Sequence, residues 1–251
     1  MSFDAHPRSS LIVALDFDSL SSAVRFATKI ADLVGMFKIG SQLFTAAGPA
    51  AVKEVAALGP GVFLDLKFHD IPNTVAGAVL SAAAISGVQL MNIHALGGAA
   101  MMAAAAQAIS AVSAMGEDRP RLLAVTILTS MDQKSMREAG IGGLPKERVL
   151  KLAKLAKKAG VDGVVASVEE ARAIRKACGP DFLIVTPGVR PAEPGAGKKS
   201  RGPGDDQART ATPREAIEAG ADFLVVGRPI LAAADPRAAA QAIVEEIAAA
   251  K

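Results

Sequence analysis

The stretch Val62-Phe63-Leu64-Asp65-Leu66-Lys67 is short, rich in branched and aromatic apolar residues, and turns charged only towards its end. Such a run, without alternating polar positions, is typical of a strand that is buried on both faces in a parallel sheet. Seven further runs of the same character occur along the chain, at residues 11–15, 36–39, 88–93, 122–127, 163–166, 182–185 and 223–226. The sequence therefore predicts eight buried parallel strands, with residues 62–66 as the third.

Between these runs lie longer, alanine-rich stretches with helical periodicity. Asp18 and Ser19 open the first of them, and Asp235-Pro236 opens the last. The predicted helices lie near residues 19–34, 50–58, 73–86, 99–114, 146–159, 168–177, 213–219 and 236–250. Eight strand-then-helix units predict an α/β fold, a (β/α)₈ TIM barrel. A doubly wound open sheet is the alternative, but no glycine fingerprint follows the first strand.

The length fits a single barrel. The chain has 251 residues, close to the roughly 250 typical of this architecture, and no linker or change in composition divides it. We therefore expect one domain over residues 1–251. Two long loops, at residues 128–145 and 187–212, interrupt the regular pattern, and loops of this length in a compact domain are usually either functional lids or disordered.

Composition excludes several classes of protein. Apolar residues make up 51% and charged residues 21% of the chain, which excludes a disordered protein. With 28 basic and 25 acidic residues the net charge is +3, and Trp and Tyr are absent. This balance is too even, and the aromatic content too low, for a dedicated nucleic-acid binder. We expect no nucleic-acid partner.

The number of cysteines and the length of the apolar runs indicate the cellular compartment of the protein. Cys178 is the single cysteine, so no internal disulfide can form, and a reducing cytoplasm is the expected location. The first residues lack a signal-like apolar stretch. We expect that no apolar run approaches the ~18 residues needed to span a bilayer, and we expect no membrane partner.

Charged residues gather where the predicted strands end, which is where barrels of this kind carry their catalytic groups. Asp65 and Lys67 are two positions apart on one strand, so their side chains share a face. Asp16 and Lys38 close the two preceding strands, and Asp70 lies just past the third. Together they form a cluster of alternating sign. It is either a catalytic constellation or a structural network of ion pairs at the barrel rim.

A second signal follows the last two strands. Gly227-Arg228 follows the eighth strand and Thr186-Pro187-Gly188 ends the seventh, which is the usual phosphate position in these barrels. Backbone N–H groups at a glycine turn and an arginine fork suit a phosphate dianion. A tight turn with a solvated arginine is the alternative.

Histidines and metal ligands are less informative. We interpret His69 as structural, and His94 as hydrogen-bonded to the backbone. No His, Cys or carboxylate residues have convincing metal-ligand spacing. Asp65 and Asp70 could hold Mg²⁺, but the neighbouring lysines would compete with the cation. No metal site is predicted.

Residues 65–74, Asp-Leu-Lys-Phe-His-Asp-Ile-Pro-Asn-Thr, resemble the signature of the orotidine 5′-phosphate decarboxylase family. Further matching segments follow in the family's order, at residues 14–16, 37–40, 92–95, 128–131, 186–191 and 226–230. The resemblance implies a decarboxylase that converts orotidine 5′-phosphate to UMP in pyrimidine biosynthesis. It also implies a homodimer with active sites at the interface, and a reaction without cofactor or metal.

The resemblance assigns roles around the reacting carbon. It implies that Lys67 protonates C6 of the pyrimidine as CO₂ leaves and that Asp65 lies against the departing carboxylate. Asp70 would enter from the partner subunit. Lys38 and Asp16 would hold the ribose hydroxyls and the charge network.

For the rest of the substrate the resemblance implies two further groups of residues. Ile71 and Thr74 would reach across the interface, and Thr129 would contact the pyrimidine region. The phosphate would be gripped by three side chains and one backbone N–H, those of Arg190, Gln207, Arg228 and Gly227.

One segment departs from the family's pattern. The loop at residues 191–212 is longer than usual and reads Gly204-Asp205-Asp206-Gln207 where Gly-Asp-Gln is typical. Lys198, Lys199 or Arg201 could therefore share the phosphate contact. Two alternatives stay open: another phosphosugar decarboxylase or aldolase of the same barrel superfamily that uses Mg²⁺, and a non-catalytic nucleotide-binding protein.

Overall fold

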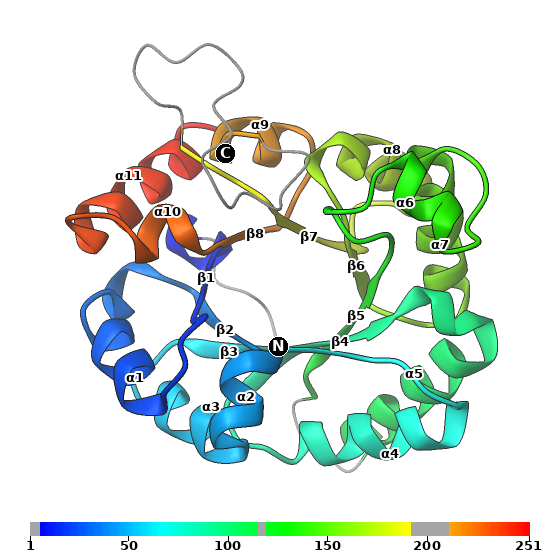
Figure 1. The fold of residues 1–251 in the computed structure, drawn as a ribbon, viewed down its shortest axis with the longest axis horizontal. Helices are drawn as coiled ribbons and strands as arrows, with labels where there is room; N and C mark the ends of the chain where they lie inside the picture. The colour runs from blue at the N-terminus through cyan, green and yellow to red at the C-terminus, as the bar shows by residue number, and fades with distance from the viewer. Residues whose placement is uncertain (1–5, 115–118, 192–210) are drawn as a thin grey trace.

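The computed structural model describes residues 6–114, 119–191 and 211–251. Within them eight parallel strands close into a barrel in sequence order, each paired with the next and β8 paired with β1 (Figure 1). The (β/α)₈ barrel predicted from the sequence is confirmed. The strands are β1 (Leu11–Ala14), β2 (Met36–Gly40), β3 (Gly61–Phe68), β4 (Val88–His94), β5 (Arg121–Val125), β6 (Gly163–Val165), β7 (Leu183–Pro187) and β8 (Phe223–Val226).

Helices surround the barrel on all sides (Figure 1). They are α1 (Leu20–Thr28), α2 (Ser41–Ala47), α3 (Pro49–Ala56), α4 (Pro72–Ala83), α5 (Gly98–Ala114), α6 (Gln133–Glu138), α7 (Pro145–Lys158), α8 (Val168–Cys178), α9 (Pro213–Glu218), α10 (Arg228–Leu231) and α11 (Pro236–Ala248). Three short 3₁₀ turns lie at Pro7–Ser10, Ala31–Leu33 and Ala95–Gly97. Ser19 and Asp235 cap α1 and α11 through their side chains, as predicted.

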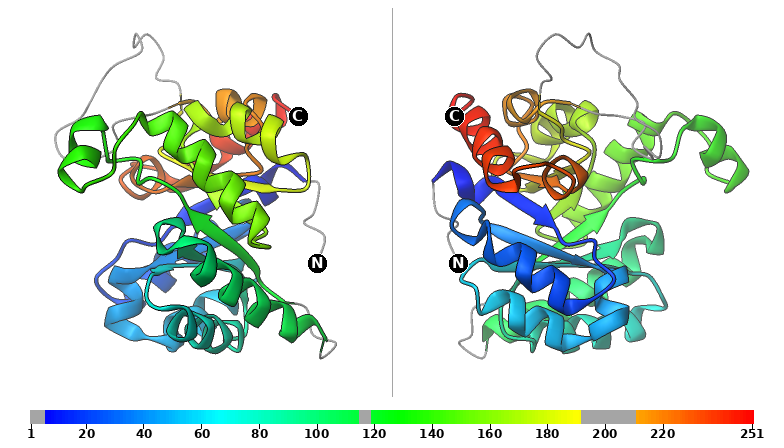
Figure 2. Two further views of the ribbon diagram at one scale, coloured as in Figure 1. Left: turned by 90° about the vertical axis from the view of Figure 1, so that its right-hand side faces the viewer. Right: turned by 60° about the vertical axis from the view of Figure 1, so that its left-hand side comes forward.

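The predicted helix at 19–34 is wrong in length. The α-helix ends at Thr28, and Ala31–Leu33 forms a separate 3₁₀ turn. The apolar periodicity continues past the helix end because Ile30 and Val34 are both buried, although the backbone between them has turned. The short helices α2, α6 and α10 were not predicted. Because α6 lies inside the loop at 128–145, that loop has structure of its own and stands out from the barrel (Figure 2).

Two apolar layers hold the barrel together. Side chains that point inward from the strands, among them Ile12, Phe63 and Leu90, fill its interior. Side chains that point outward, such as Leu64 and Met91, pack against the helices. Along β3 the two layers alternate as Phe63 inward and Leu64 outward, which places the next residue, Asp65, on the inward series.

One helical segment is more apolar than its sequence predicted. Among the described residues, Ala95–Val112 is long and apolar enough to cross a membrane by length and composition, so the expectation that no run approaches that length is wrong. Its alanine content sustains the hydropathy where large apolar side chains are few. Its buried residues, including Met101, Met102 and Ile109, belong to the layer between the barrel and the helices. In this structure the segment is a barrel helix.

Candidate active site

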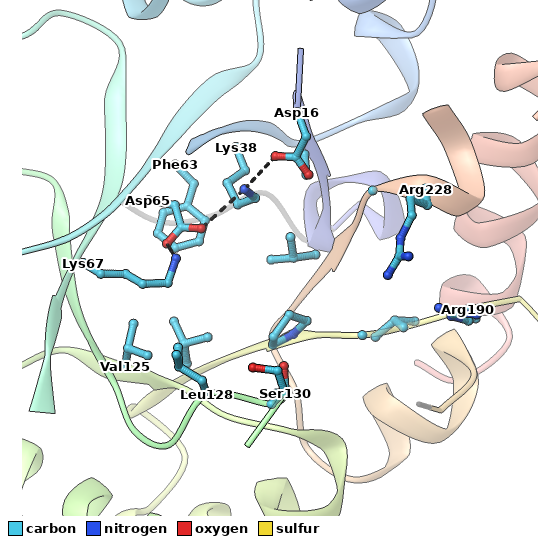
Figure 3. Close-up of a pocket in the computed structure, with 18 of the residues that line it drawn as sticks. Asp16, Lys38, Phe63, Asp65, Lys67, Val125, Leu128, Ser130, Arg190 and Arg228 are labelled. Carbon is cyan, nitrogen blue, oxygen red and sulfur yellow. Dashed lines mark hydrogen bonds and ion pairs between the residues drawn. The ribbon is translucent and has the colours of Figure 1, made fainter. Parts of the chain in front are cut away.

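A cavity of about 330 Å³ opens at the carboxyl end of the strands (Figure 3). Its base is formed by inward-facing apolar residues such as Phe63 and Val225. Its upper wall carries polar residues that continue the same inward series. Eight of the residues predicted from the sequence line it: Asp16, Lys38, Asp65, Lys67, Thr129, Arg190, Gly227 and Arg228.

The charged residues from β1, β2 and β3 form one connected chain of ion pairs. Lys67 Nζ lies 2.7 Å from Asp65 Oδ1, and Lys38 Nζ lies 3.4 Å from Asp65 Oδ2. Lys38 Nζ is also 3.3 Å from Asp16 Oδ1. Four of the five residues predicted for the cluster are therefore in contact, with Asp65 between two ammonium groups (Figure 3), and Asp70 is not among them.

The Asp65 carboxylate is almost fully enclosed, and burial by itself would raise its pKa. The charges of Lys38 and Lys67, together with hydrogen bonds from Lys67 and Asn92, outweigh burial and hold the pKa of Asp65 below its ordinary value of 3.8. Asp65 therefore stays ionised at neutral pH. A fixed negative charge lies next to a lysine that faces the cavity.

Gly40 leaves room for this arrangement. A Cβ atom at residue 40 would lie 3.0 Å from Lys38 Nζ, closer than nearly all Cβ contacts in proteins. Gly40 is paired with Asp65 across the β2–β3 ladder. The absence of a side chain there lets Lys38 reach between Asp16 and Asp65.

Lys67 does not lie on a regular strand, and this corrects the argument from simple alternation. Between Leu64 and Phe68 the pairing with β4 shifts, because Leu64 pairs with Met91 and Phe68 with Ile93. An advance of four residues along β3 is thus paired with an advance of only two residues along β4, as in a β-bulge. Lys67 has φ +52°, and among the described residues it is the one non-glycine residue with positive φ. Backbone strain of this kind clusters at functional sites.

Asn92 is a site residue that the sequence analysis did not select. It is fully buried on β4. Its Nδ2 donates to Asp65 Oδ1 at 2.6 Å, and its Oδ1 accepts from the backbone N–H of Lys67 at 2.7 Å. The available signal was a polar side chain within the buried, otherwise apolar run at residues 90–93, because a buried polar side chain requires partners.

Arg190 and Arg228 lie at the opposite side of the cavity from Lys67 (Figure 3). They follow β7 and β8, with Gly188 and Gly227 beside them in the lining. The cavity therefore has a cationic end some distance from the Asp65–Lys67 pair. An elongated ligand with an anionic group at one end matches this division.

Three further predicted residues do not line this cavity. Asp70, Ile71 and Thr74 are exposed and do not line it. Asp70 Oδ1 accepts from the backbone N–H of Ile71 at 2.6 Å, and the Ile71 side chain is 66% exposed. Gln207 lies outside the described residues, as do Lys198, Lys199 and Arg201.

The two histidines stack beside the site without entering the cavity. Their ring centroids are 5.3 Å apart. His94 Nδ1 accepts from the backbone N–H of Leu96 at 3.3 Å, which confirms the interpretation of His94. Burial, assisted by the charges of His69 and Lys67, lowers the pKa of His94 to about 4. His94 is therefore neutral at physiological pH.

Comparison with known proteins identifies the family. The family model described as "Orotidine 5'-phosphate decarboxylase / HUMPS family" matches residues 9–243. The chain belongs to this family. Within the described residues no group of three or more His, Cys, Asp or Glu side chains is placed to hold a metal ion.

Curated relatives match over nearly the full length. A protein of Trichlorobacter lovleyi named orotidine 5'-phosphate decarboxylase is 55% identical over 242 residues, which cover 96% of each chain. One of the same name from Geotalea daltonii is 54% identical, covering 96% of this chain and 97% of the relative. The crystal structure of orotidine 5'-phosphate decarboxylase from Lactobacillus acidophilus superposes with a TM-score of 0.80 at 40% identity, covering 94% of this chain and 98% of the other.

Proposed function

We propose that this protein is an enzyme that decarboxylates orotidine 5′-phosphate to UMP in pyrimidine biosynthesis. The observation that carries the proposal is the pairing of Lys67 with an ionised, buried Asp65 inside a cavity whose far end is cationic. Family membership and relatives above 50% identity support the same activity. The cavity volume lies within the roughly 300–1,000 Å³ typical of small-molecule sites.

The proposed reaction breaks the bond between C6 of the pyrimidine and its carboxylate carbon. The electron pair of that bond stays on C6 as CO₂ leaves, and the ammonium group of Lys67 then gives C6 a proton. Lys67 is left neutral and regains a proton from water. Because the negative charge develops next to a preorganised ammonium group, Lys67 stabilises the transition state before it protonates C6.

Asp65 has a double role in this proposal. It pairs with Lys67 through the 2.7 Å contact and so holds the lysine head group at the cavity. Its own charge would lie beside the substrate carboxylate and lose that neighbour as CO₂ departs. Lys38, held between Asp65 and Asp16, would balance the network and, with Asp16, bind the ribose hydroxyls.

The cationic end of the cavity is the proposed phosphate site. Arg190, Arg228 and the backbone N–H of Gly227 would bind the phosphate, with Gln207 as a fourth contact, and Thr129 would contact the pyrimidine region. Binding energy gained there, remote from C6, can hold the reacting end of the substrate in place. No cofactor and no metal take part in the proposed reaction.

We propose a homodimer in which each subunit completes its partner's site. Asp70, Ile71 and Thr74 lie together after β3, exposed and outside the cavity of their own chain. An exposed isoleucine beside a carboxylate at the rim of a site suits an interface that buries both.

We also propose that residues 1–251 form a single domain and that the protein is located in the cytoplasm.

A spectrophotometric assay tests the activity. Purified protein mixed with orotidine 5′-phosphate should produce the ultraviolet change that accompanies UMP formation, and the rate should persist with excess chelator. Loss of the rate with chelator, and its return with Mg²⁺, would instead favour a Mg²⁺-dependent phosphosugar enzyme of the same barrel. Binding of UMP without turnover would favour a non-catalytic nucleotide-binding protein.

A further inference from the structure

The side chain of Asn92 contacts both members of the Asp65–Lys67 pair. Its amide N–H donates to the Asp65 carboxylate at 2.6 Å, and its amide oxygen accepts from the Lys67 backbone at 2.7 Å. Asn92 is 0% exposed, so bulk water cannot replace either bond. One amide thus fixes the direction of the carboxylate and the backbone from which the lysine extends.

The second of these bonds falls at the strained point of the strand. Lys67 has φ +52°, in the left-handed region that residues with a Cβ rarely adopt. It lies inside the segment where β3 and β4 lose their regular pairing. A strained backbone persists only where its surroundings determine it. The Asn92 oxygen gives the Lys67 N–H a partner in place of a regular ladder bond.

An amide suits this position better than the other side chains of its size. It offers a donor and an acceptor at once, and both are used. Aspartate would place a second carboxylate against Asp65, and leucine would leave the Lys67 N–H without a partner. The asparagine among the buried apolar residues of this strand, at positions 90–93, is therefore explained by the two groups that it joins.

We propose that Asn92 is a positioning residue for the decarboxylation: it holds the Lys67 backbone in its left-handed conformation and the Asp65 carboxylate in line with the Lys67 ammonium group. The inference rests on the function proposed above and adds a residue to it. Asn92 does not line the cavity, so it acts through Asp65 and Lys67 and not by touching substrate.

The first test is Asn92→Ala, assayed with orotidine 5′-phosphate. We expect kcat to fall on the order of 10²-fold, the loss typical of a small misplacement of reacting groups. KM should change little, because the proposed phosphate contacts come from β7 and β8. The matched control is Thr126→Val. Thr126 is also fully buried beyond a barrel strand, and its hydroxyl donates to the Val165 carbonyl at 3.0 Å. Both kcat and KM of this control should stay close to wild type.

The second test is Asn92→Asp, which keeps the shape and so guards against misfolding of the alanine variant. At neutral pH two carboxylates would face each other, and the Asp65–Lys67 alignment should be lost. At lower pH the pair can hold one proton, and the new carboxyl group can donate to Asp65 as the amide did. We expect kcat relative to wild type to rise as pH falls. The surrounding titratable groups are Lys38, Asp65, Lys67 and the stacked His69 and His94.

Three outcomes would overturn the proposal, and one crystallographic outcome would support it. Asn92→Ala with kcat within threefold of wild type overturns it, as does an Asn92→Asp variant whose pH profile parallels wild type. If the wild-type protein does not act on orotidine 5′-phosphate, the proposed function fails, and a crystal structure of Asn92→Ala still decides the positioning role. Lys67 retaining positive φ and its contact with Asp65 in that crystal would overturn it. Relaxation of both, with an unchanged fold, would support it.

Discussion

At the amino end of the barrel, Asp162 accepts from the Arg119 guanidinium at 2.6 and 2.7 Å and from the backbone N–H of Leu122 at 2.8 Å. At the carboxyl end, Asp65 is equally enclosed but meets Lys67 and Lys38. Arg121 Nη1 also lies 3.5 Å from Asp162 Oδ1, so both ends hold a carboxylate between two cations just beyond the apolar interior. They differ in which cation is used and in what the carboxylate holds.

The amino-end arrangement occurs twice. Asp222, just before β8, accepts from the backbone N–H of Ile184 and from Arg175, each at 2.7 Å. Arg175 also donates to the carbonyls of Gly179, Pro180, Phe182 and Gly220, which closes the turns below β7 and β8. In both places an aspartate joins neighbouring strands through a backbone N–H. This is a structural use of charge.

The cations explain why one end can perform chemistry. An arginine fork binds in a fixed geometry and keeps its proton throughout the pH range that proteins tolerate. A lysine ammonium group is a single flexible donor that can give a proton away and regain it. The strained backbone under Lys67 has no counterpart among the non-glycine residues described at the amino end. Two features thus distinguish the ion pairs that stabilise the fold from those proposed to react: the type of cation and the backbone conformation of the residue that carries it.

The largest expected effect concerns Lys67. Lys67→Ala should lose turnover on the order of 10⁴-fold or more, because it removes both the proton donor and the charge that stabilises the transition state. Steady-state or single-turnover assays measure the loss, and UMP binding should persist. Turnover within tenfold of wild type would mean that the ion pairs at the carboxyl end only stabilise the fold, as the Arg119–Asp162 pair does. The proposed difference between the two ends would then be wrong.

The next effect tests whether the carboxyl end is shared between subunits. Lys67→Ala and Asp70→Ala homodimers should each be nearly inactive. When equal amounts of the two variants are mixed under conditions of subunit exchange, half of the dimers become hybrids. In each hybrid one of the two sites carries neither substitution, so about one quarter of wild-type activity should return. The matched control pairs Lys67→Ala with Asp65→Ala, whose hybrids have a lesion in every site and should recover nothing. Verified hybrids without recovered activity would place Asp70 within its own chain's site.

Much of this division between the two ends follows from the sequence. Eight apolar runs without alternation predict eight strands buried on both faces, and the structure has all eight. The polar residues that follow those runs, such as Asp16, Lys38 and Asp65, continue the inward-facing series. Their convergence on one cavity is therefore a consequence of strand order and pleat.

The remainder depends on tertiary pairing. The register shift between Leu64 and Phe68 arises from the way β3 meets β4, and no local pattern in β3 encodes it. The contacts of Asn92 with Asp65 and Lys67 depend on that shift and could not be predicted from the sequence either. The helices α2 and α6 are too short to show a clear period. The proposed role of Asp70 in the partner's site was predicted only through the family resemblance, since the sequence of one chain cannot show what a second copy contributes.

A third prediction separates the two halves of the cavity itself. Arg228→Ala should lower kcat/KM on orotidine 5′-phosphate by about 10–100-fold, since a charge-assisted hydrogen bond contributes about 1.5–3 kcal/mol. On orotidine, which lacks the phosphate, the same variant should resemble wild type. Equal losses on both substrates would indicate that Arg228 supports the fold, as the arginines of the amino end do.

A fourth prediction concerns stability at the amino end. Arg175→Ala should leave turnover per folded molecule unchanged and reduce the free energy of unfolding by roughly 2 kcal/mol, because several carbonyls and Asp222 lose their donor. Thermal unfolding should then begin about 4–8 °C lower. Arg237→Ala is the matched control. Arg237 pairs with Asp32 at 2.6 Å, but both side chains are more than half exposed, so its loss should leave the melting temperature nearly unchanged. An equal effect of both variants would contradict the structural role of Arg175.

The smallest expected effect concerns stability: the contributions of Asp65 and Asp222 to the free energy of unfolding should change with pH in opposite directions. The lysines hold the pKa of Asp65 below 3.8, whereas burial raises the pKa of Asp222 above 3.8 despite its partners. The unfolded chain therefore binds a proton more readily than folded Asp65, and the contribution of Asp65 to stability is lost as pH falls below 3.8. Folded Asp222 binds a proton more readily than the unfolded chain, so its contribution decreases as pH rises above 3.8.

Urea unfolding of Asp65→Asn and Asp222→Asn, compared with wild type across acidic pH, measures these two slopes. The stability difference between wild type and Asp65→Asn should grow with rising pH below 3.8, and the difference for Asp222→Asn should shrink above it. Each slope is at most about 1.4 kcal/mol per pH unit. Asp65→Asn also leaves two lysines without their carboxylate and is less stable throughout, so the slope and not the offset carries the test. Slopes of the same sign would mean that the two ends do not differ in how they hold charge.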